Sequence, residues 1–265
     1  MLPVSIKDFA LVLALAGKGQ IFSPHAPTLH QIVELLLRWI HYIAGITWIG
    51  LLYFFNFVNG SFMKSLDGPT KDKVTPQLMP RALWWFRWGA FVTVLAGLGI
   101  FGLYLRADQG TWMLLGRWAA IVLVTYVVIY GIQRVNWGPG KGWGLAAAVT
   151  VIVSVMAVVM LVWSSGGDPT DMSKGLFSQD AHSLSISIGG GLGTIMFLNV
   201  WGIIWPIQKR LIAWTIDKAD KGTAPPSEAA ALGRRAFLAS RMNTWLSIPM
   251  LLFMAAGSHG YFFGR

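Results

Sequence analysis

The stretch RWIHYIAGITWIG, from Arg38 to Gly50, decides how this chain folds. Apart from Arg38, His41 and Thr47 it consists of apolar, aromatic and glycine residues, and it lies inside a longer apolar run over 30–58. A helix needs roughly 20 mostly apolar residues to cross about 30 Å of hydrocarbon. We therefore predict that 30–58 is a transmembrane helix, with an arginine and a histidine placed inside the membrane.

The composition of the whole chain is that of an integral membrane protein. Of its 265 residues, 55% are hydrophobic and only 12% are charged. Because lipid offers no hydrogen bonds to an open backbone, the spanning elements should be helices. We predict an all-α fold with one integral membrane domain over 1–265, a polytopic bundle of about six transmembrane helices. The expected spans are 30–58, 82–105, 114–136, 142–164, 183–208 and 241–263, preceded by a short surface helix at DFALVLALAG, 8–17.

The net charge of +10 orients the bundle rather than indicating nucleic acid, because the basic residues lie in short loops where they meet anionic lipid. One side of the membrane receives Lys64, Lys71, Lys73, Arg81, Arg134, Lys141, Lys209, Arg210, Lys218, Lys221, Arg234, Arg235 and Arg241. The other receives Lys7, Lys18, Arg106, Arg117, Lys174 and Arg265. The positive-inside rule makes the first side cytoplasmic. The expected location is the bacterial inner membrane, with both termini in the periplasm.

The histidines gather in the outer half of the predicted bundle: His25, His30, His41, His182 and His259. A neutral imidazole is the usual ligand of haem b iron, and two imidazoles from facing helices complete its coordination. The chain has no cysteine, so any haem is bound without a covalent link. We predict haem b with His41 and His259 as axial ligands, and His182 as an alternative ligand.

The neighbours of His41 suit a flat cofactor. Gly45 and Trp48 follow at i+4 and i+7 on its helical face, where a macrocycle could approach the glycine and pack on the indole. Arg38, one turn toward the outer surface, could pair with a haem propionate. Two plainer interpretations stay open: the arginine reaches lipid phosphate, and the histidine forms a hydrogen bond to another helix.

The fifth predicted span contains a second informative pattern. Gly189, Gly190, Gly191 and Gly193 open it and permit close packing of helices or of a cofactor, and close helix packing is the preferred interpretation. Asn199 follows inside the same span, and Asn243 and Pro249 lie in the last one.

Four segments together resemble the membrane domain of the bacterial PuuD-type urate hydroxylases. They are RWIHYIAGITWIG (38–50), ALWWFRWGAF (82–91), GTIMFLNVWGIIWPIQKR (193–210) and NTWLSIPMLLFMAAGSHG (243–260), in that order. The resemblance matches the first-span histidine to His41 and the last-span histidine to His259. The resemblance also implies a histidine a few residues before GTIM; the corresponding place in this chain is near Ser187, and the nearest histidine is His182.

The resemblance implies a redox function. Full-length members carry a cytochrome c domain and oxidise urate, whereas these 265 residues contain no CxxCH. We expect electrons to pass from urate or a quinol, through haem b, to a separate periplasmic or membrane-tethered cytochrome c. The alternative is a non-catalytic accessory subunit of a respiratory or photosynthetic membrane complex, surrounded by other subunits and lipid. A small-solute permease is less favoured, because no inverted repeat or pair of broken helices is evident.

Overall fold

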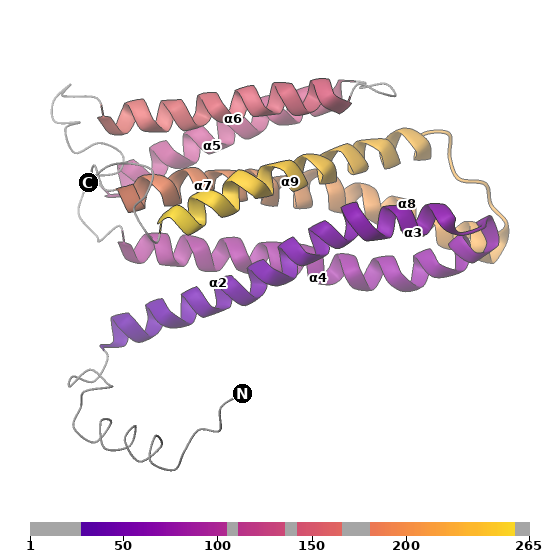
Figure 1. Cartoon of the computed structure of the whole chain (residues 1–265). Helices are drawn as coiled ribbons and strands as arrows, with labels where there is room; N and C mark the ends of the chain where they lie inside the picture. Colours follow the sequence, from indigo (N-terminus) through magenta and orange to yellow (C-terminus); the bar gives the residue numbers. More distant parts are fainter. Residues whose placement is uncertain (1–27, 105–110, 136–141, 166–180, 258–265) are drawn as a thin grey trace, which may run out of the picture.

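The computed structural model describes residues 28–104, 111–135, 142–165 and 181–257, and no β-strand occurs among them. The helices are α2 (Leu29–Tyr53), α3 (Gly60–Ser65), α4 (Gly68–Tyr104), α5 (Thr111–Arg134), α6 (Gly142–Ser165), α7 (Ala181–Asn199), α8 (Trp205–Lys221) and α9 (Ala229–Gly257). Two π-helical segments continue α2 and α7: η1 (Phe54–Asn59) and η2 (Val200–Ile204). The predicted all-α membrane bundle is confirmed (Figure 1).

Five helical segments of the described chain are long and apolar enough to span a membrane: Leu29–Ser65, Gly68–Leu103, Leu115–Arg134, Gly142–Val162 and Leu184–Lys221. They contain the first five predicted spans or coincide closely with them. The sixth prediction, 241–263, extends beyond the described residues, and its part up to Gly257 is helical within α9. The short helix expected at 8–17 lies outside the described residues.

Two helices are longer than their predicted spans at one end of the bundle. The chain is already helical from Gly68, before the predicted start at 82, and it stays helical to Lys221, past the predicted end at 208. A salt bridge of 2.7 Å between Lys218 Nζ and Asp72 joins the two extensions. Hydropathy identifies only the apolar part of a helix. Polar turns that continue the helix into water are therefore missing from the predicted spans. We call this end, which carries Lys71, Arg81, Arg134, Lys218 and Arg235, the basic end.

Helices α2 and α4 form one tightly packed pair, and α7 and α9 form another (Figure 1). Glycine permits both contacts. A Cβ on Gly89 of α4 would lie 3.3 Å from the backbone nitrogen of Trp48 and 3.4 Å from the carbonyl oxygen of Ala44, both on α2. A Cβ on Gly189 of α7 would lie 3.3 Å from the backbone nitrogen of Met254 on α9. Since lipid competes for apolar side chains, close backbone approach at small residues is what holds such pairs together.

Side-chain hydrogen bonds also tie α2 to α9 in the half nearer the basic end. Tyr53 and Ser247 share a hydrogen bond of 3.0 Å between their hydroxyls, and Asn56 Nδ2 donates to Ser240 Oγ at 2.9 Å. Toward its start at Leu29, α2 diverges from α9 (Figure 1). The divergence leaves room between α2 and the α7–α9 pair in the half of the bundle away from the basic end.

A buried amide network connects α5, α7 and α9. Asn199 Nδ2 donates to Asn243 Oδ1 at 2.8 Å, and Asn199 Oδ1 accepts from Gln133 Nε2 at 3.1 Å, while Asn243 Nδ2 donates to the Met196 carbonyl at 2.9 Å. Both asparagines are completely buried. Each interhelical bond of this kind contributes roughly 1 kcal/mol in a membrane. The network fixes how the three helices are rotated against one another.

The contact at Gly89 yields a test of the packing. We expect Gly89→Ala to lower the free energy of unfolding by about 1–3 kcal/mol, because the added methyl group meets backbone atoms that cannot rotate away. Unfolding by SDS in mixed micelles measures this change.

Gly102→Ala is the matched control, since Gly102 lies on the same helix with no atom within 4 Å of its would-be Cβ. Equal stability of the two variants would show that α2 and α4 do not touch at Gly89.

Candidate functional site

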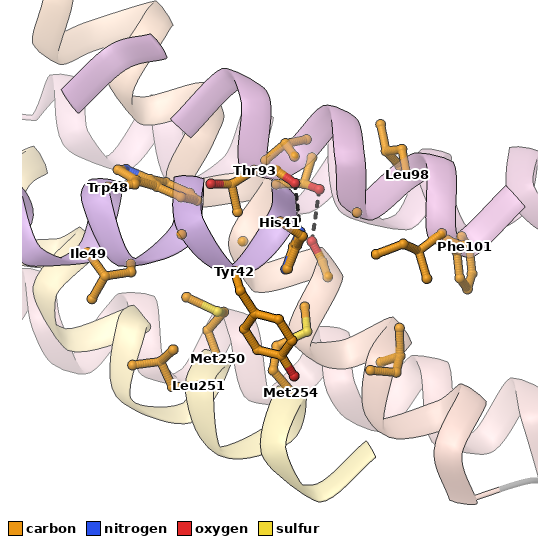
Figure 2. Close-up of a pocket in the computed structure, with 18 of the residues that line it drawn as sticks. His41, Tyr42, Trp48, Ile49, Thr93, Leu98, Phe101, Met250, Leu251 and Met254 are labelled. Carbon is orange, nitrogen blue, oxygen red and sulfur yellow. Dashed lines mark hydrogen bonds between the residues drawn. The ribbon is translucent and has the colours of Figure 1, made fainter. Parts of the chain in front are cut away.

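A cavity of about 530 Å³ occupies the space between α2, α4, α7 and α9 (Figure 2). Its volume lies within the roughly 300–1,000 Å³ typical of small-molecule and cofactor sites. All four described residues that the sequence predicts for the site line it: Arg38, His41, Gly45 and Trp48. The one-face arrangement expected from their spacing is therefore found in the structure.

The imidazole of His41 is held by α4. Its Nδ1 lies 2.8 Å from the carbonyl oxygen of Thr93. Because a carbonyl oxygen only accepts hydrogen bonds, Nδ1 carries the proton, and in the neutral ring Nε2 keeps its lone pair. No bond from Nε2 is found among the described residues. The ring is thus in the tautomer that leaves Nε2 available as a ligand.

Glycine at position 97 makes room for this ring. A Cβ there would lie 3.0 Å from Cε1 and 3.2 Å from Nδ1 of His41, closer than normal packing allows. Gly89, Thr93 and Gly97 recur every four residues, so all three small residues face α2. Thr93 donates its own hydroxyl to the Gly89 carbonyl at 2.7 Å and keeps its side chain compact. This small-residue stripe was not identified from the sequence, although its spacing is a readable signal.

Arg38 lies at the edge of the cavity with a partner that the sequence analysis missed. Its Nη2 and Nε contact Glu34 Oε1 at 2.7 and 3.1 Å, one helical turn earlier. The side chains are 43% and 24% exposed, so the pair is only partly shielded. A carboxylate at i−4 reduces the cost of placing the arginine near lipid, without requiring any cofactor.

Gly45 and Trp48 form the wall of the cavity next to His41. The would-be Cβ of Gly45 lies 3.7 Å from Thr93 Cγ2, so this glycine also serves the contact between α2 and α4. Trp48 is 1% exposed, and its indole Nε1 is buried without a hydrogen-bond partner among the described residues.

The opposite wall comes from α7 and α9, which present small residues and thioethers. Ser187, Gly190, Gly193 and Thr194 line it from α7, and Met250 and Met254 line it from α9. Figure 2 shows both methionines across the cavity from His41. Trp118 of α5 closes one side and donates its Nε1 to the Ser187 carbonyl at 3.0 Å.

The remaining two predicted ligands are not placed by the structure. His182 is the second residue of α7, but its side chain lies outside the described part, as does the whole of His259. Within the described part, no cluster of three or more histidine, cysteine, aspartate or glutamate side chains is suited to a bare metal ion. Ligation by His259 and by His182 stays a prediction.

The arrangement can hold a flat, largely apolar molecule beside one imidazole nitrogen, with a guanidinium at the edge for an acidic substituent.

Comparison with known proteins identifies the family. The family model described as urate oxidase N-terminal matches residues 67–265 and includes three of the four segments quoted above, while 38–50 precedes the match. No curated protein and no solved structure matches the chain. Since the match covers most of the sequence, the chain belongs to the urate oxidase N-terminal family.

Proposed function

We propose that this protein is a haem b redox protein of the bacterial inner membrane, in which His41 is an axial ligand of the haem iron. The observation that carries the proposal is the fixed imidazole in the cavity: Nδ1 is bound to the Thr93 carbonyl, and His41 lines a space of cofactor size. Histidines that ligate metals commonly donate their other N–H to a backbone carbonyl, which sets the ring orientation and raises the basicity of the ligating nitrogen.

The second axial ligand in this proposal is His259. Helix α9 lines the cavity up to Met254 and is helical to Gly257, and His259 follows two residues later. The described part of α9 therefore ends on the wall opposite His41. His182, at the start of α7, is the alternative. Both assignments come from the sequence and the family resemblance.

The other lining residues suit the shape and charge of a haem. Gly45 on one wall and Gly190 and Gly193 on the other add no side chain to the cavity, and Trp48 contributes an aromatic ring to its lining. Arg38 lies at the edge, where it could share its guanidinium between Glu34 and a propionate. A bound haem b would supply reversible one-electron chemistry, and the protein would fix its position and its potential.

The reduced substrate is urate or a quinol, and membership of the urate oxidase N-terminal family favours urate. Ser187 lines the cavity where the family pattern has a histidine, so an imidazole at this position in a relative would face the same space. The 265 residues contain no cysteine, so a c-type haem that receives the electrons is carried outside them. We propose a periplasmic or membrane-tethered cytochrome c as the acceptor.

Removing the proposed ligand tests the function directly. We expect purified His41→Ala protein to lose its haem, seen as loss of the Soret and alpha bands in a reduced-minus-oxidised spectrum, because an apolar cavity without the imidazole no longer anchors the iron. His30→Ala is the control, since His30 is exposed on the same helix and should leave the spectrum unchanged.

Full haem content in folded His41→Ala protein would refute the ligand assignment. Wild-type protein without any haem spectrum would leave the accessory-subunit interpretation instead.

The orientation of the ring gives a second test. We expect Gly97→Ala to weaken haem binding by roughly tenfold or more, because its Cβ displaces the imidazole from the Thr93 carbonyl. Haem titration of the apoprotein measures this affinity. Gly102→Ala adds the same methyl group where nothing lies within 4 Å, and it should bind haem like the wild type. A Gly97→Ala protein with unchanged affinity would show that the hydrogen bond does not position the ligand.

A further inference from the structure

Three hydrogen-bond donors converge at the basic end of the bundle without an acid among them. Arg134, the last residue of α5, donates from Nη2 to the hydroxyl of Tyr130 at 2.8 Å, and its guanidinium carbon lies 4.9 Å from the centre of the Tyr130 ring. Arg235 approaches the same ring from α9, with its guanidinium carbon at 5.5 Å. Two cations from different helices therefore share one neutral ring.

The donors at this place exceed the acceptors. The Tyr130 oxygen is used as an acceptor by Arg134, which leaves its own O–H proton free to be donated. Arg235 Nε is buried and has no hydrogen-bond partner among the described residues. A buried guanidinium nitrogen without an acceptor is unfavourable unless an anion completes the site.

The carboxylates in the described part of the chain do not supply that anion. The acidic residues at the basic end are Asp67, Asp72, Asp217, Asp220 and Glu228. Asp72 pairs with Lys218, Asp217 with Lys221 and Glu228 with Arg210, while Asp67 accepts from the backbone of Thr70 and Asp220 lies beside Lys221. None of the ion pairs in the described part of the chain includes Arg134 or Arg235. The segment NWGPGK (136–141), which follows α5 closely, contains no acidic residue.

The position of the cluster indicates where the missing anion comes from. The first residue of α6, Gly142, approaches Leu238 on α9, one turn from Arg235, with a would-be Cβ at 3.7 Å. The next residue, Trp143, lies in the first turn of α6 and is 74% exposed. Exposed tryptophans at the ends of transmembrane helices mark the headgroup level of a bilayer. The two arginines therefore lie at the depth of lipid phosphates.

We propose that Tyr130, Arg134 and Arg235 bind the phosphate of an anionic phospholipid between α5 and α9. Guanidinium groups form paired hydrogen bonds to phosphate oxygens, and the tyrosine hydroxyl adds a third donor. Basic pockets between helices on the inner side of a membrane are suited to such headgroups. This site is independent of the haem proposal, because it lies at the other end of the bundle.

Native mass spectrometry of the full chain in a non-ionic detergent tests the site, with phosphatidylglycerol and phosphatidylcholine of identical acyl chains as probes. We expect wild-type protein to retain phosphatidylglycerol in preference, and the double variant Arg134→Gln/Arg235→Gln to bind it at least roughly tenfold more weakly. Tyr130→Phe, which removes one donor and no charge, should weaken it less.

Arg241→Gln is the control for the single variant Arg134→Gln, because each removes one positive charge; Arg241 is exposed on α9 and lies over Phe237, 5.6 Å from its centre. Gel filtration and helical circular dichroism establish that each variant is folded. If the double variant does not fold, the single variant Arg134→Gln tests the site instead. Arg134 is exposed, so its replacement should leave the fold intact. Equal retention of both lipids by wild type, or retention of phosphatidylglycerol by the folded arginine variants, would overturn the proposal.

A further experiment distinguishes a free anion from a lipid as the ligand. Inorganic phosphate is added to detergent-solubilised protein, and the melting temperature is measured. A rise in wild type but not in the double variant, together with no preference for phosphatidylglycerol, would assign the arginines to a soluble phosphate and overturn the lipid as their ligand.

Discussion

The close approach of α2 and α4 is the constraint on which the candidate site depends. Gly89 lets the two backbones touch, and with the helices at this separation the Thr93 carbonyl is 2.8 Å from the His41 ring. If the helices were held further apart by larger side chains, the imidazole would lose its partner and could take other orientations and either tautomer. The chemistry available at His41 is therefore set by residues on α4 that carry no chemistry themselves. The same stripe explains why a polar ring can stay inside a membrane helix without an unsatisfied N–H.

The two halves of the bundle are built on different principles. Near the basic end, α2, α5, α7 and α9 are joined by side-chain hydrogen bonds, including the Asn199–Asn243 pair and the bond between Tyr53 and Ser247. In the opposite half a cavity separates α2 from the α7–α9 pair, which stays closely packed at Gly189, while α4 keeps close contact with α2. The hydrogen bonds of the polar half fix how each helix is rotated about its axis. This rotation determines which face of each helix lines the cavity in the other half. Stability and ligand binding thus belong to different depths of the same helices.

Most of the fold could be predicted from the sequence, because transmembrane helices appear in it as long runs of apolar residues. Helix ends in water could not: Gly68 and Lys221 lie in polar segments whose helicity depends on pairing such as Lys218 with Asp72. Part of the site was also predictable, since Arg38, His41, Gly45 and Trp48 share one helical face and line one cavity. The residues on the other helices were not identified. Thr93 and Gly97 matter only through their distance to His41, and such pairing between helices is not visible in one sequence without a contact map. The Glu34–Arg38 pair was visible as an i, i+4 spacing and was overlooked.

The π-helical segment η2 has a consequence for how this protein tolerates changes in chain length. A π-turn holds one residue more than an α-turn, so the helix after Val200–Ile204 is rotated relative to the helix before it. If the same residues formed uniform α-helix, every residue after Ile204 would be turned by about 100°. The buried side of α8, with Ile207 and Ile212, would then face the surrounding solvent or lipid, and Lys218 would leave Asp72. Deleting one residue within Val200–Ile204 would let a uniform α-helix form with α8 still in place, whereas a deletion inside an α-helical part of α7 or α8 would turn everything that follows it.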